Sequence, residues 1–481
     1  MKHLATALAA FSLATAAAAA PADGIIRHVS VVDVEHGQLL PDQAVAWAGG
    51  RIVAAGPDAE VARAWQAAST TDGRGRYLIP GLWDMHVHFG GGPALTAENQ
   101  ALLPLYIANG VTTIRDCSGD LPAEVLAWRD QIASGTLIGP RLFTSGAKLE
   151  GLKPIWKGTI EVGNKADVDA AIAAERKSQV DFIKITDSTL DPQLFLYAVT
   201  KARASGFRVS GHIPMQDTVG QAIDAGLSSI EHLDYAYKAG VKDEAQIAAD
   251  FAAGRIDRAE ANRRIDAGFD PATADAAYRR MAAARVFVTP TLTISNITAH
   301  LDQQTHTNDP ELAYIGPGLR KTYDWRIQRA ASATPAEVAA RHAHFDRMAA
   351  ILPLLQAAGV TLMAGTDAGF LNSFDYPGSS LHTELALFVQ HGLTPAEALR
   401  SATRAGPDWF GQLDLYGAIT PGKTADLVLL TRNPLEDITA TRAIDAVVLR
   451  GRTFNRAALD AMLAKTRAQV AKWNAEAAKA R

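Results

Sequence analysis

The chain has 481 residues, of which 48% are hydrophobic and 20% are charged, and its formal net charge is -4. This composition is typical of a globular protein with a large core and argues against disorder. Lys and Arg are scattered along the chain, so we expect no nucleic-acid partner.

The first residues have the features of an export signal. Lys2 precedes an Ala-rich apolar run, and small residues suited to cleavage follow between Ala19 and Ala22. We therefore predict a signal peptide over residues 1–22 and a periplasmic or extracellular protein. The alternative is an N-terminal helix of the mature fold. No later apolar run reaches the ~18 residues of a membrane span, so none is expected.

Two β-rich segments lie at opposite ends of the chain. Residues 25–57 and 417–454 both contain short apolar runs broken by Gly turns. Each segment alone is small for a core, so we predict that residues 23–80 and 412–456 together form a small β-sandwich-like domain. Two unconnected β subdomains are the alternative.

Residues 81–411 alternate short apolar runs with helical stretches, which is typical of βα units around a parallel sheet. The candidate strands are 82–89, 111–116, 140–146, 181–186, 207–212, 228–232, 286–292 and 361–367. Eight such strands predict an α/β fold with a closed (β/α)₈ TIM barrel.

Three further stretches are predicted to be helical. Residues 238–285 and 296–350 are longer than a simple crossover needs, and they could form a lid or cover the outside of the barrel. Residues 457–481 predict a C-terminal amphipathic helix. Its apolar face would consist of Leu459, Met462, Leu463 and Val470.

Metal-ligand or base residues end several of the predicted strands. They are His86, His88, Lys184, His212, His232 and Asp367. In a barrel, the carboxyl ends of the strands surround one site, and the i, i+2 spacing of the first two places both imidazoles on one face. Cys117 is the only cysteine and is predicted to be a small core residue. A metal would therefore be held by His and carboxylate ligands, which favours zinc or manganese.

Each of these residues also has an ordinary structural interpretation. A single His at a strand end is commonly a hydrogen-bonded structural residue, Lys184 could pair with a carboxylate, and Asp367 could cap a helix or form a turn. An unpaired ammonium inside a barrel is costly, however, so Lys184 invites a chemical explanation. Taken together, the six residues favour a metal-binding site over six separate structural roles.

The order of the short motifs resembles the amidohydrolase superfamily. HVH, IKI, GHIP, IEHLD and AGTDAG follow one another, together with GVTTIRD at 110–116, GLTPAEALRSAT at 392–403 and ADLVLL near the C-terminus. The chain is similar to the imidazolonepropionase-like and prolidase-like branch of metal-dependent hydrolases. The resemblance covers nearly all of the chain after the export signal.

This resemblance implies a two-metal site. The HVH pair and Asp367 would bind the more buried ion, His212 and His232 would bind the second, and Lys184, N6-carboxylated, would bridge them. Zn²⁺ is the expected metal, with Mn²⁺ or another divalent ion as the alternative, and one-metal members of the superfamily also exist. Asp367 would act as the catalytic base that passes a proton from the attacking water to the leaving amine.

Substrate contacts are less clearly defined. Tyr235 follows His232 and could bind a substrate oxygen or pack in a loop, while Lys148 and Trp156 lie in the loop after the third strand. Some prolidase-like relatives carry a TGGH-like motif in that region for the carboxylate of the substrate. This chain lacks the motif, which argues against a dipeptidase. His382 either faces the pocket or orients another residue.

Arg115 and Asp116 end the second predicted strand. We expect these two residues to form a structural ion pair.

The sequence therefore predicts an exported hydrolase of amide-type C–N bonds acting on a small molecule, such as a dipeptide, an N-acyl amino acid, a cyclic amide or a related xenobiotic. A lactone or ester hydrolase is the nearest alternative, because water activation does not depend on the leaving atom. A non-catalytic periplasmic binding protein and a phosphotriesterase-like enzyme are further alternatives. Homo-oligomer formation is left open.

Overall fold

The computed structural model describes residues 19–479. The predicted signal peptide lies outside the described residues over 1–18. Its last residues, from Ala20 on, belong to a β-strand in which Ala20–Ala22 pair with Trp65–Ala67 of a parallel neighbour.

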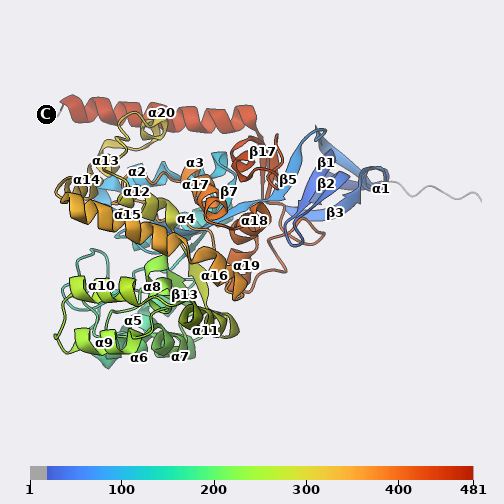
Figure 1. The fold of residues 1–481 in the computed structure, drawn as a ribbon. Coiled ribbons are helices and arrows are strands. Elements are labelled where there is room, and N and C mark those ends of the chain that lie inside the picture. Colours follow the sequence, from blue (N-terminus) through green and yellow to red (C-terminus); the bar gives the residue numbers. More distant parts are fainter. Residues whose placement is uncertain (1–18, 480–481) are drawn as a thin grey trace, which may run out of the picture.

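Strands from both ends of the chain join in one eight-stranded sheet, drawn at one end of the molecule in Figure 1. Its order is β18-β17-β16-β5-β1-β2-β3, with β4 paired to β1. The strands are β1 (Ala20–Asp33), β2 (Gln38–Ala48), β3 (Arg51–Pro57), β4 (Trp65–Asp72), β5 (Tyr77–Pro80), β16 (Leu427–Leu430), β17 (Ile444–Leu449) and β18 (Arg452–Asn455). The antiparallel pairing of β5 with β16 connects the two chain ends.

β16 shows why this sheet packs against the rest of the protein. Its sequence LVLL is apolar at every position, and all four residues are buried. Because side chains alternate along a strand, Leu427 and Leu429 enter the core of the terminal sheet, whereas Val428 and Leu430 pack into the main core. A continuous apolar run is therefore a strand covered on both faces.

The middle of the chain forms two parallel sheets, which confirms the predicted α/β class. The four-stranded sheet has the order β15-β6-β7-β8, and the six-stranded sheet has the order β10-β9-β11-β12-β13-β14. The strands are β6 (Leu82–His88), β7 (Val111–Asp116), β8 (Arg141–Thr144), β9 (Leu149–Glu150), β10 (Ile160–Glu161), β11 (Ile183–Ile185), β12 (Val209–Gly211), β13 (Ser229–Glu231), β14 (Phe287–Thr289) and β15 (Ala368–Gly369).

The eighth predicted strand, 361–367, differs from the other seven. It contains only a parallel bridge between Leu362 and Val288, and β15 begins after it. Asp367 has a left-handed backbone with φ of 73°, which interrupts the extended conformation at the residue expected to be functional. Gly365 is needed just before it, since a Cβ there would lie 2.9 Å from the backbone nitrogen of His86.

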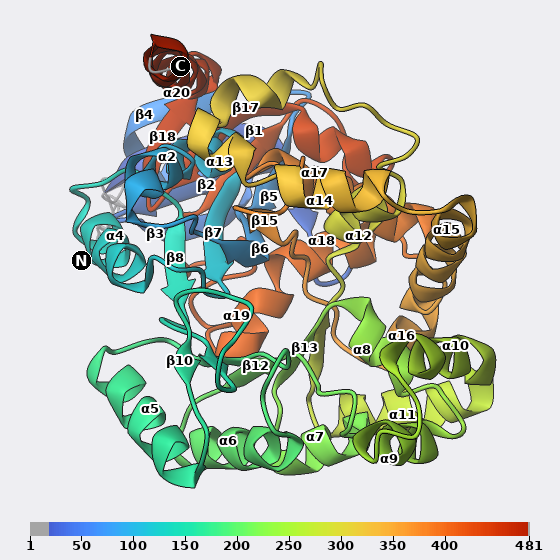
Figure 2. The same ribbon diagram turned by 90° about the vertical axis from the view of Figure 1, so that its left-hand side faces the viewer.

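Helices surround the parallel sheets, and Figure 2 shows α5, α6 and α7 in a row outside them. Up to the second long insertion the helices are α1 (Asp58–Ala64), α2 (Thr96–Gln100), α3 (Leu103–Ala108), α4 (Pro122–Ser134), α5 (Lys165–Lys177), α6 (Pro192–Ala204), α7 (Val219–Ala225), α8 (Leu233–Lys238), α9 (Glu244–Ala252), α10 (Arg258–Gly268) and α11 (Pro271–Ala283). They are followed by α12 (Leu292–Ala299), α13 (Pro317–Lys321), α14 (Asp324–Ala331), α15 (Pro335–Ala349), α16 (Leu352–Ala357), α17 (Ser379–Gln390), α18 (Pro395–Thr403), α19 (Ala405–Phe410) and α20 (Arg456–Lys479). Short 3₁₀ helices are η1 (Pro93–Leu95), η2 (Pro310–Tyr314) and η3 (Ile438–Arg442).

Both long insertions are helical. The second one reaches the carboxyl end of the parallel strands, where Trp325 of α14 donates its indole N–H to the Leu371 carbonyl at 3.0 Å. The C-terminal helix α20 buries Leu459 and Val470, and Met462 and Leu463 pack against the main core. Among the described helices, none is both long enough and apolar enough to cross a membrane.

Candidate active site

The six predicted site residues converge at the carboxyl ends of the parallel strands. His86 and His88 belong to β6, Lys184 to β11, His212 and His232 directly follow β12 and β13, and Asp367 directly precedes β15. All except His86 line one cavity of about 130 Å³, and His86 lies directly behind it in contact with His88 and Asp367.

His86, His88 and Asp367 form the first half of the site. Asp367 Oδ1 lies 2.8 Å from His88 Nε2 and 3.3 Å from His86 Nε2, and the two Nε2 atoms are 3.1 Å apart. The backbone nitrogen of Asp367 donates to the carbonyl of His86 at 2.7 Å, so main chain and side chain of Asp367 are both tied to β6.

The contacts of the two Nδ1 atoms indicate which nitrogen of each imidazole carries a hydrogen. His86 Nδ1 lies 2.7 Å from Glu231 Oε2, and His88 Nδ1 contacts the carbonyl oxygen of Ser118. A carbonyl and an ionised carboxylate can only accept, so both Nδ1 atoms carry the hydrogen. Loss of any hydrogen from Nε2 would then leave two lone pairs beside the carboxylate of Asp367, within 3.3 Å. Such a donor set suits a cation.

His212, His232 and Lys184 form the second half. The Nε2 atoms of His212 and His232 are 3.2 Å apart, and Lys184 Nζ lies 3.3 Å from His212 Nε2. His232 Nδ1 lies 2.7 Å from the Thr291 hydroxyl, and His212 Nδ1 lies 3.6 Å from Asp187. The ring of His232 lies 5.0 Å from that of His86, and this contact joins the two halves.

Lys184 is almost fully buried, with 1% of its surface exposed. Within residues 19–479, its only side-chain hydrogen-bond partner is His212, and it forms no ion pair with a described carboxylate. The predicted ordinary alternative, a Lys paired with a neighbouring carboxylate, therefore does not describe this side chain. An uncompensated ammonium at this depth is unfavourable.

Glu231 links the site to the interior below it. Its carboxylate accepts from Arg115 at 2.8 Å on both oxygens and from the hydroxyls of Ser210 and Ser229 at 2.7 and 2.6 Å. Arg115 therefore pairs with Glu231, and the expected Arg115–Asp116 pair is wrong. Asp116 accepts from the Thr144 hydroxyl at 2.8 Å instead. The two side chains cannot meet because neighbouring residues of β7 point to opposite faces.

Burial and hydrogen bonding shift the pKa values of the acidic groups in opposite directions. Burial alone would raise the pKa of Asp367, but the hydrogen bond with His88 and the nearby imidazoles hold it well below its usual range. Likewise, burial opposes ionisation of Glu231, but Arg115 and His86 keep its pKa well below normal. Burial raises the pKa of Asp84 to about 7, and it lowers the pKa of His86 and of His212 well below the usual value. The site thus combines ionised carboxylates with two imidazoles, those of His86 and His212, for which burial favours the neutral form that metal ligation requires.

The predicted substrate residues do not all lie at the site. Lys148 and Trp156 line the cavity, with Lys148 Nζ 5.3 Å from the centre of the Trp156 ring. Tyr235 stacks on the His212 ring at 5.3 Å. His382 does not line the cavity, because it is buried on α17 with Nδ1 3.0 Å from the Thr441 hydroxyl. Cys117 is buried, as predicted, and belongs to the lining of the cavity.

Sequence reasoning missed the side chains that complete the site. Glu231 stands in the IEH motif, and its position between Ile230 and the candidate ligand His232 at the end of a predicted strand is a signal that could have singled it out. Arg326, Phe370 and Asn372 also line the cavity, and Arg326 comes from α14 of the second insertion. Nothing in the local sequence of α14 distinguishes Arg326 from an exposed helical Arg.

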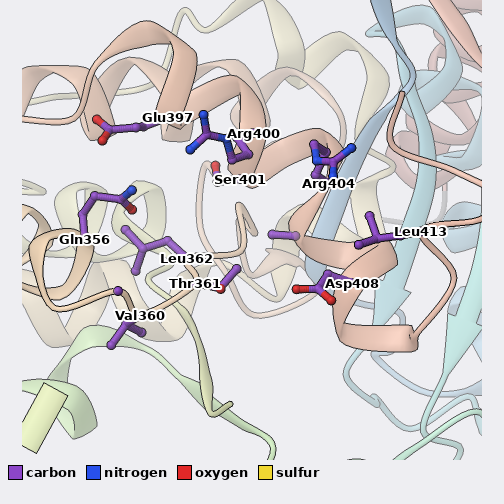
Figure 3. Close-up of a pocket in the computed structure, with 12 residues that line it drawn as sticks. Gln356, Val360, Thr361, Leu362, Glu397, Arg400, Ser401, Arg404, Asp408 and Leu413 are labelled. Atoms are coloured by element: carbon purple, nitrogen blue, oxygen red, sulfur yellow. The ribbon is translucent and has the colours of Figure 1, made fainter. Parts of the chain in front are cut away.

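A second hollow of about 220 Å³ lies at the other end of the segment that leads to Asp367 (Figure 3). It is lined by Thr361 and Leu362 and by charged side chains that already have partners. Arg404 pairs with Glu35 at 3.0 Å, and Asp408 pairs with Arg285 at 2.7 Å. This hollow shares no lining residue with the cavity of the six predicted site residues.

Comparison with protein families matches residues 77–454 to the amidohydrolase family. The chain belongs to this family. The match confirms the resemblance inferred from the motifs, and this amidohydrolase is a hydrolase acting on C–N bonds.

Individual relatives are distant. Ochratoxinase of Aspergillus niger is 24% identical over 454 residues, which cover 84% of this chain and 80% of that protein. Among solved structures, bottromycin amidohydrolase has a TM-score of 0.71 at 22% identity, covering 93% of this chain and 90% of its own. A Xaa-Pro dipeptidase with bound methionine has a TM-score of 0.64 at 21% identity, covering 90% and 99%. These structures share the fold.

Proposed function

We propose that this protein is a metal-dependent amidohydrolase that uses two divalent ions, with Zn²⁺ as the expected metal, to cleave an amide bond in a small molecule. The observation that carries the proposal is the convergence of the six predicted residues around one cavity in a chain of this family. His86, His88 and Asp367 would hold one ion, and His212 and His232 the other. When bound, the ions would lower the pKa of a coordinated water and polarise the substrate carbonyl.

Lys184 would join the two halves as a carbamate. Its neutral amine would add to carbon dioxide, forming an N–C bond, losing one proton and leaving an anionic group with two oxygen donors. The burial of Lys184 without a described carboxylate partner supports this, because the modification replaces an unfavourable buried cation with an anion beside the metals.

Asp367 would be the catalytic residue that moves the proton. It is ionised at neutral pH, since the hydrogen bond with His88 holds its pKa low despite burial. It would accept the proton of the attacking water and deliver it to the nitrogen of the leaving amine. Its left-handed backbone, bonded to the His86 carbonyl, keeps the carboxylate aimed at the cavity.

We further propose that the two parallel sheets are parts of one closed (β/α)₈ barrel. Backbone hydrogen bonds between the two sheets support this. The backbone N–H of Asp181 donates to the Thr144 carbonyl at 2.9 Å, and the backbone N–H of Met363 donates to the Val288 carbonyl at 2.8 Å. A third bond would close the ring of strands, because the backbone N–H of Met85 donates to the Ala364 carbonyl at 2.9 Å. The terminal eight-stranded sheet would then be the small β domain.

We also propose that the protein is exported after cleavage of a signal peptide. Because Ala20–Ala22 pair with β4, we propose cleavage close to Ala19, which leaves β1 complete. N-terminal sequencing of the protein recovered from the periplasm tests this. A mature chain that retains Met1 would contradict it.

The experiment for the main proposal is hydrolysis by metal-loaded protein of a panel of N-acyl amino acids, dipeptides, cyclic imides and lactones, before and after chelation. We expect chelator-sensitive cleavage of at least one amide. Cleavage of lactones alone would favour the esterase alternative. No hydrolysis of any compound by fully loaded protein would favour a binding protein.

A further inference from the structure

Arg326 of α14 lies between two cavities. It lines the active-site cavity, and it also lines a neighbouring cavity of about 490 Å³ between α12, α14 and α15. Trp325, next to it, lines the outer cavity and meets the edge of Trp156, which lines the inner one, at 6.5 Å. Residues from the second insertion therefore form the boundary between the outer cavity and the site.

Two cationic side chains, Lys148 and Arg326, line the inner cavity alongside the ligand cluster, which consists of His86, His88, Lys184, His212, His232 and Asp367. Lys148 is buried, with 6% of its surface exposed, and Arg326 is half-buried. Arg326 donates Nε to the Leu371 carbonyl at 3.0 Å and a terminal nitrogen to the Asn372 amide oxygen. Both acceptors are neutral, so the Arg326 charge is not compensated by these contacts. A guanidinium has five N–H donors, and some remain for a ligand.

The lining of the outer cavity is also rich in positively charged side chains. Arg329 and Arg341 line it together with Arg326, and the only acidic side chain in its lining is Glu337. That carboxylate accepts from the backbone and hydroxyl of Thr334 at 2.7 and 2.8 Å, where it caps α15.

These arginines differ in their counterions. Arg341 pairs with Asp302 at 3.3 Å. Arg326 and Arg329, in contrast, form no ion pair with any carboxylate of residues 19–479. Two of the three arginines are thus available to an anionic ligand.

We propose that this amidohydrolase selects anionic amides, whose negatively charged end lies at Arg326 and extends toward Arg329 while the amide lies at the ligand cluster. The inference rests on the proposed function, because it places the reacting amide at that cluster. Arg326 and Arg329 would be specificity-determining residues supplied by the second insertion. A planar guanidinium can bind a carboxylate through two parallel hydrogen bonds, so a carboxylate is the expected group.

The test compares three compounds with the metal-loaded protein. N-acetyl-phenylalaninamide is neutral, N-succinyl-phenylalaninamide carries a carboxylate on the acyl side, and N-acetyl-phenylalanine carries one on the leaving side. The aromatic ring is chosen because Trp156 and Phe370 line the cavity. The readout is the ratio of kcat/KM for each anion to that of the neutral amide, at low and high salt.

We expect one of the two anions to be preferred by about tenfold or more, with a preference that weakens as salt rises. Arg326→Gln should remove most of this ratio, and Arg329→Gln should reduce it by about threefold. Arg467→Gln is the matched control, since Arg467 is exposed on α20, lines neither cavity and carries the same charge. It should leave the ratio unchanged.

A second measurement does not depend on turnover. Ketone isosteres of the three compounds, in which a methylene replaces the amide nitrogen, are titrated calorimetrically into the same proteins. If no amide is cleaved, the proposed function fails, while the binding ratio still decides this inference. Equal binding of the neutral and anionic isosteres, or a preference that Arg326→Gln leaves intact, would overturn it.

Discussion

His86 Nδ1 lies 2.7 Å from Glu231 Oε2, and this contact connects β6 to β13 beneath the ligand cluster. The same carboxylate neutralises the fully buried Arg115. One side chain therefore orients a predicted metal ligand and also compensates a charge in the core. This arrangement is typical of a positioning residue, which acts on a site through its neighbours.

Replacing Glu231 with Gln should destabilise the protein by about 3–5 kcal/mol, because it leaves Arg115 as an uncompensated buried charge. Metal content should also fall, since an amide does not hold the Nδ1–H of His86 as firmly as a carboxylate. Urea unfolding and elemental analysis measure the two effects. Glu436→Gln, at an exposed position, is the control and should change neither. Unchanged stability would show that Arg115 is compensated elsewhere.

Lys184→Ala should lower kcat by more than ~100-fold and reduce bound metal, because the proposed bridging anion is lost. Added acetate or propionate should restore part of the activity, since a free carboxylate can occupy the space of the missing carbamate. Lys157→Ala, at an exposed position of the loop after β9, is the control. A fully active Lys184→Ala protein, with or without acetate, is incompatible with a carbamate bridge.

Asp367→Asn should lower kcat by about 10²–10⁴-fold, the usual contribution of a general acid–base group, while the four histidines retain part of the metal. Steady-state kinetics and elemental analysis on the same sample separate these effects. Asp408→Asn makes the same chemical change in the hollow of Figure 3 and should leave kcat unaffected. Turnover near the wild-type rate would exclude Asp367 as the proton carrier.

The convergence of the six residues could be predicted because it depends on local signals. A short apolar run followed by a ligand residue identifies a strand end, and parallel strands bring such ends together. The i, i+2 spacing of His86 and His88 is likewise visible in the sequence. These signals come from the two-residue alternation of side chains in a strand and from the order of residues along the chain. They do not require knowledge of side-chain packing.

The remaining contacts depend on packing between distant segments. Arg115 could not be paired correctly, because its partner Glu231 comes from a strand 116 positions away. Arg326 belongs to an insertion whose docking against Leu371 and Asn372 is purely tertiary. His382 has the residue type of a site member, but the direction of α17 buries it against Thr441. Residue type alone does not give that direction.

His344 of α15 lies between two carboxylates, with Nε2 3.0 Å from Asp234 and Nδ1 2.9 Å from Asp266. It therefore connects the second insertion to α8 and α10. The hydrogen bonds with Asp234 and Asp266 raise the pKa of His344 to about 9, although Arg347 also contacts Asp266. Because the folded pKa lies above the unfolded value of about 6.5, this stabilisation is complete below about pH 6.5 and is lost as pH rises through about 9.

We expect the free energy of unfolding of the native protein to fall by about 1–2 kcal/mol between about pH 6 and about pH 10 from this group, since partial exposure of His344 weakens the ion pairs. His344→Gln should remove this pH-dependent part, so the variant and wild type should differ in urea unfolding at low pH and converge at high pH. A constant difference between His344→Gln and wild type at every pH would mean that His344 contributes packing rather than charge.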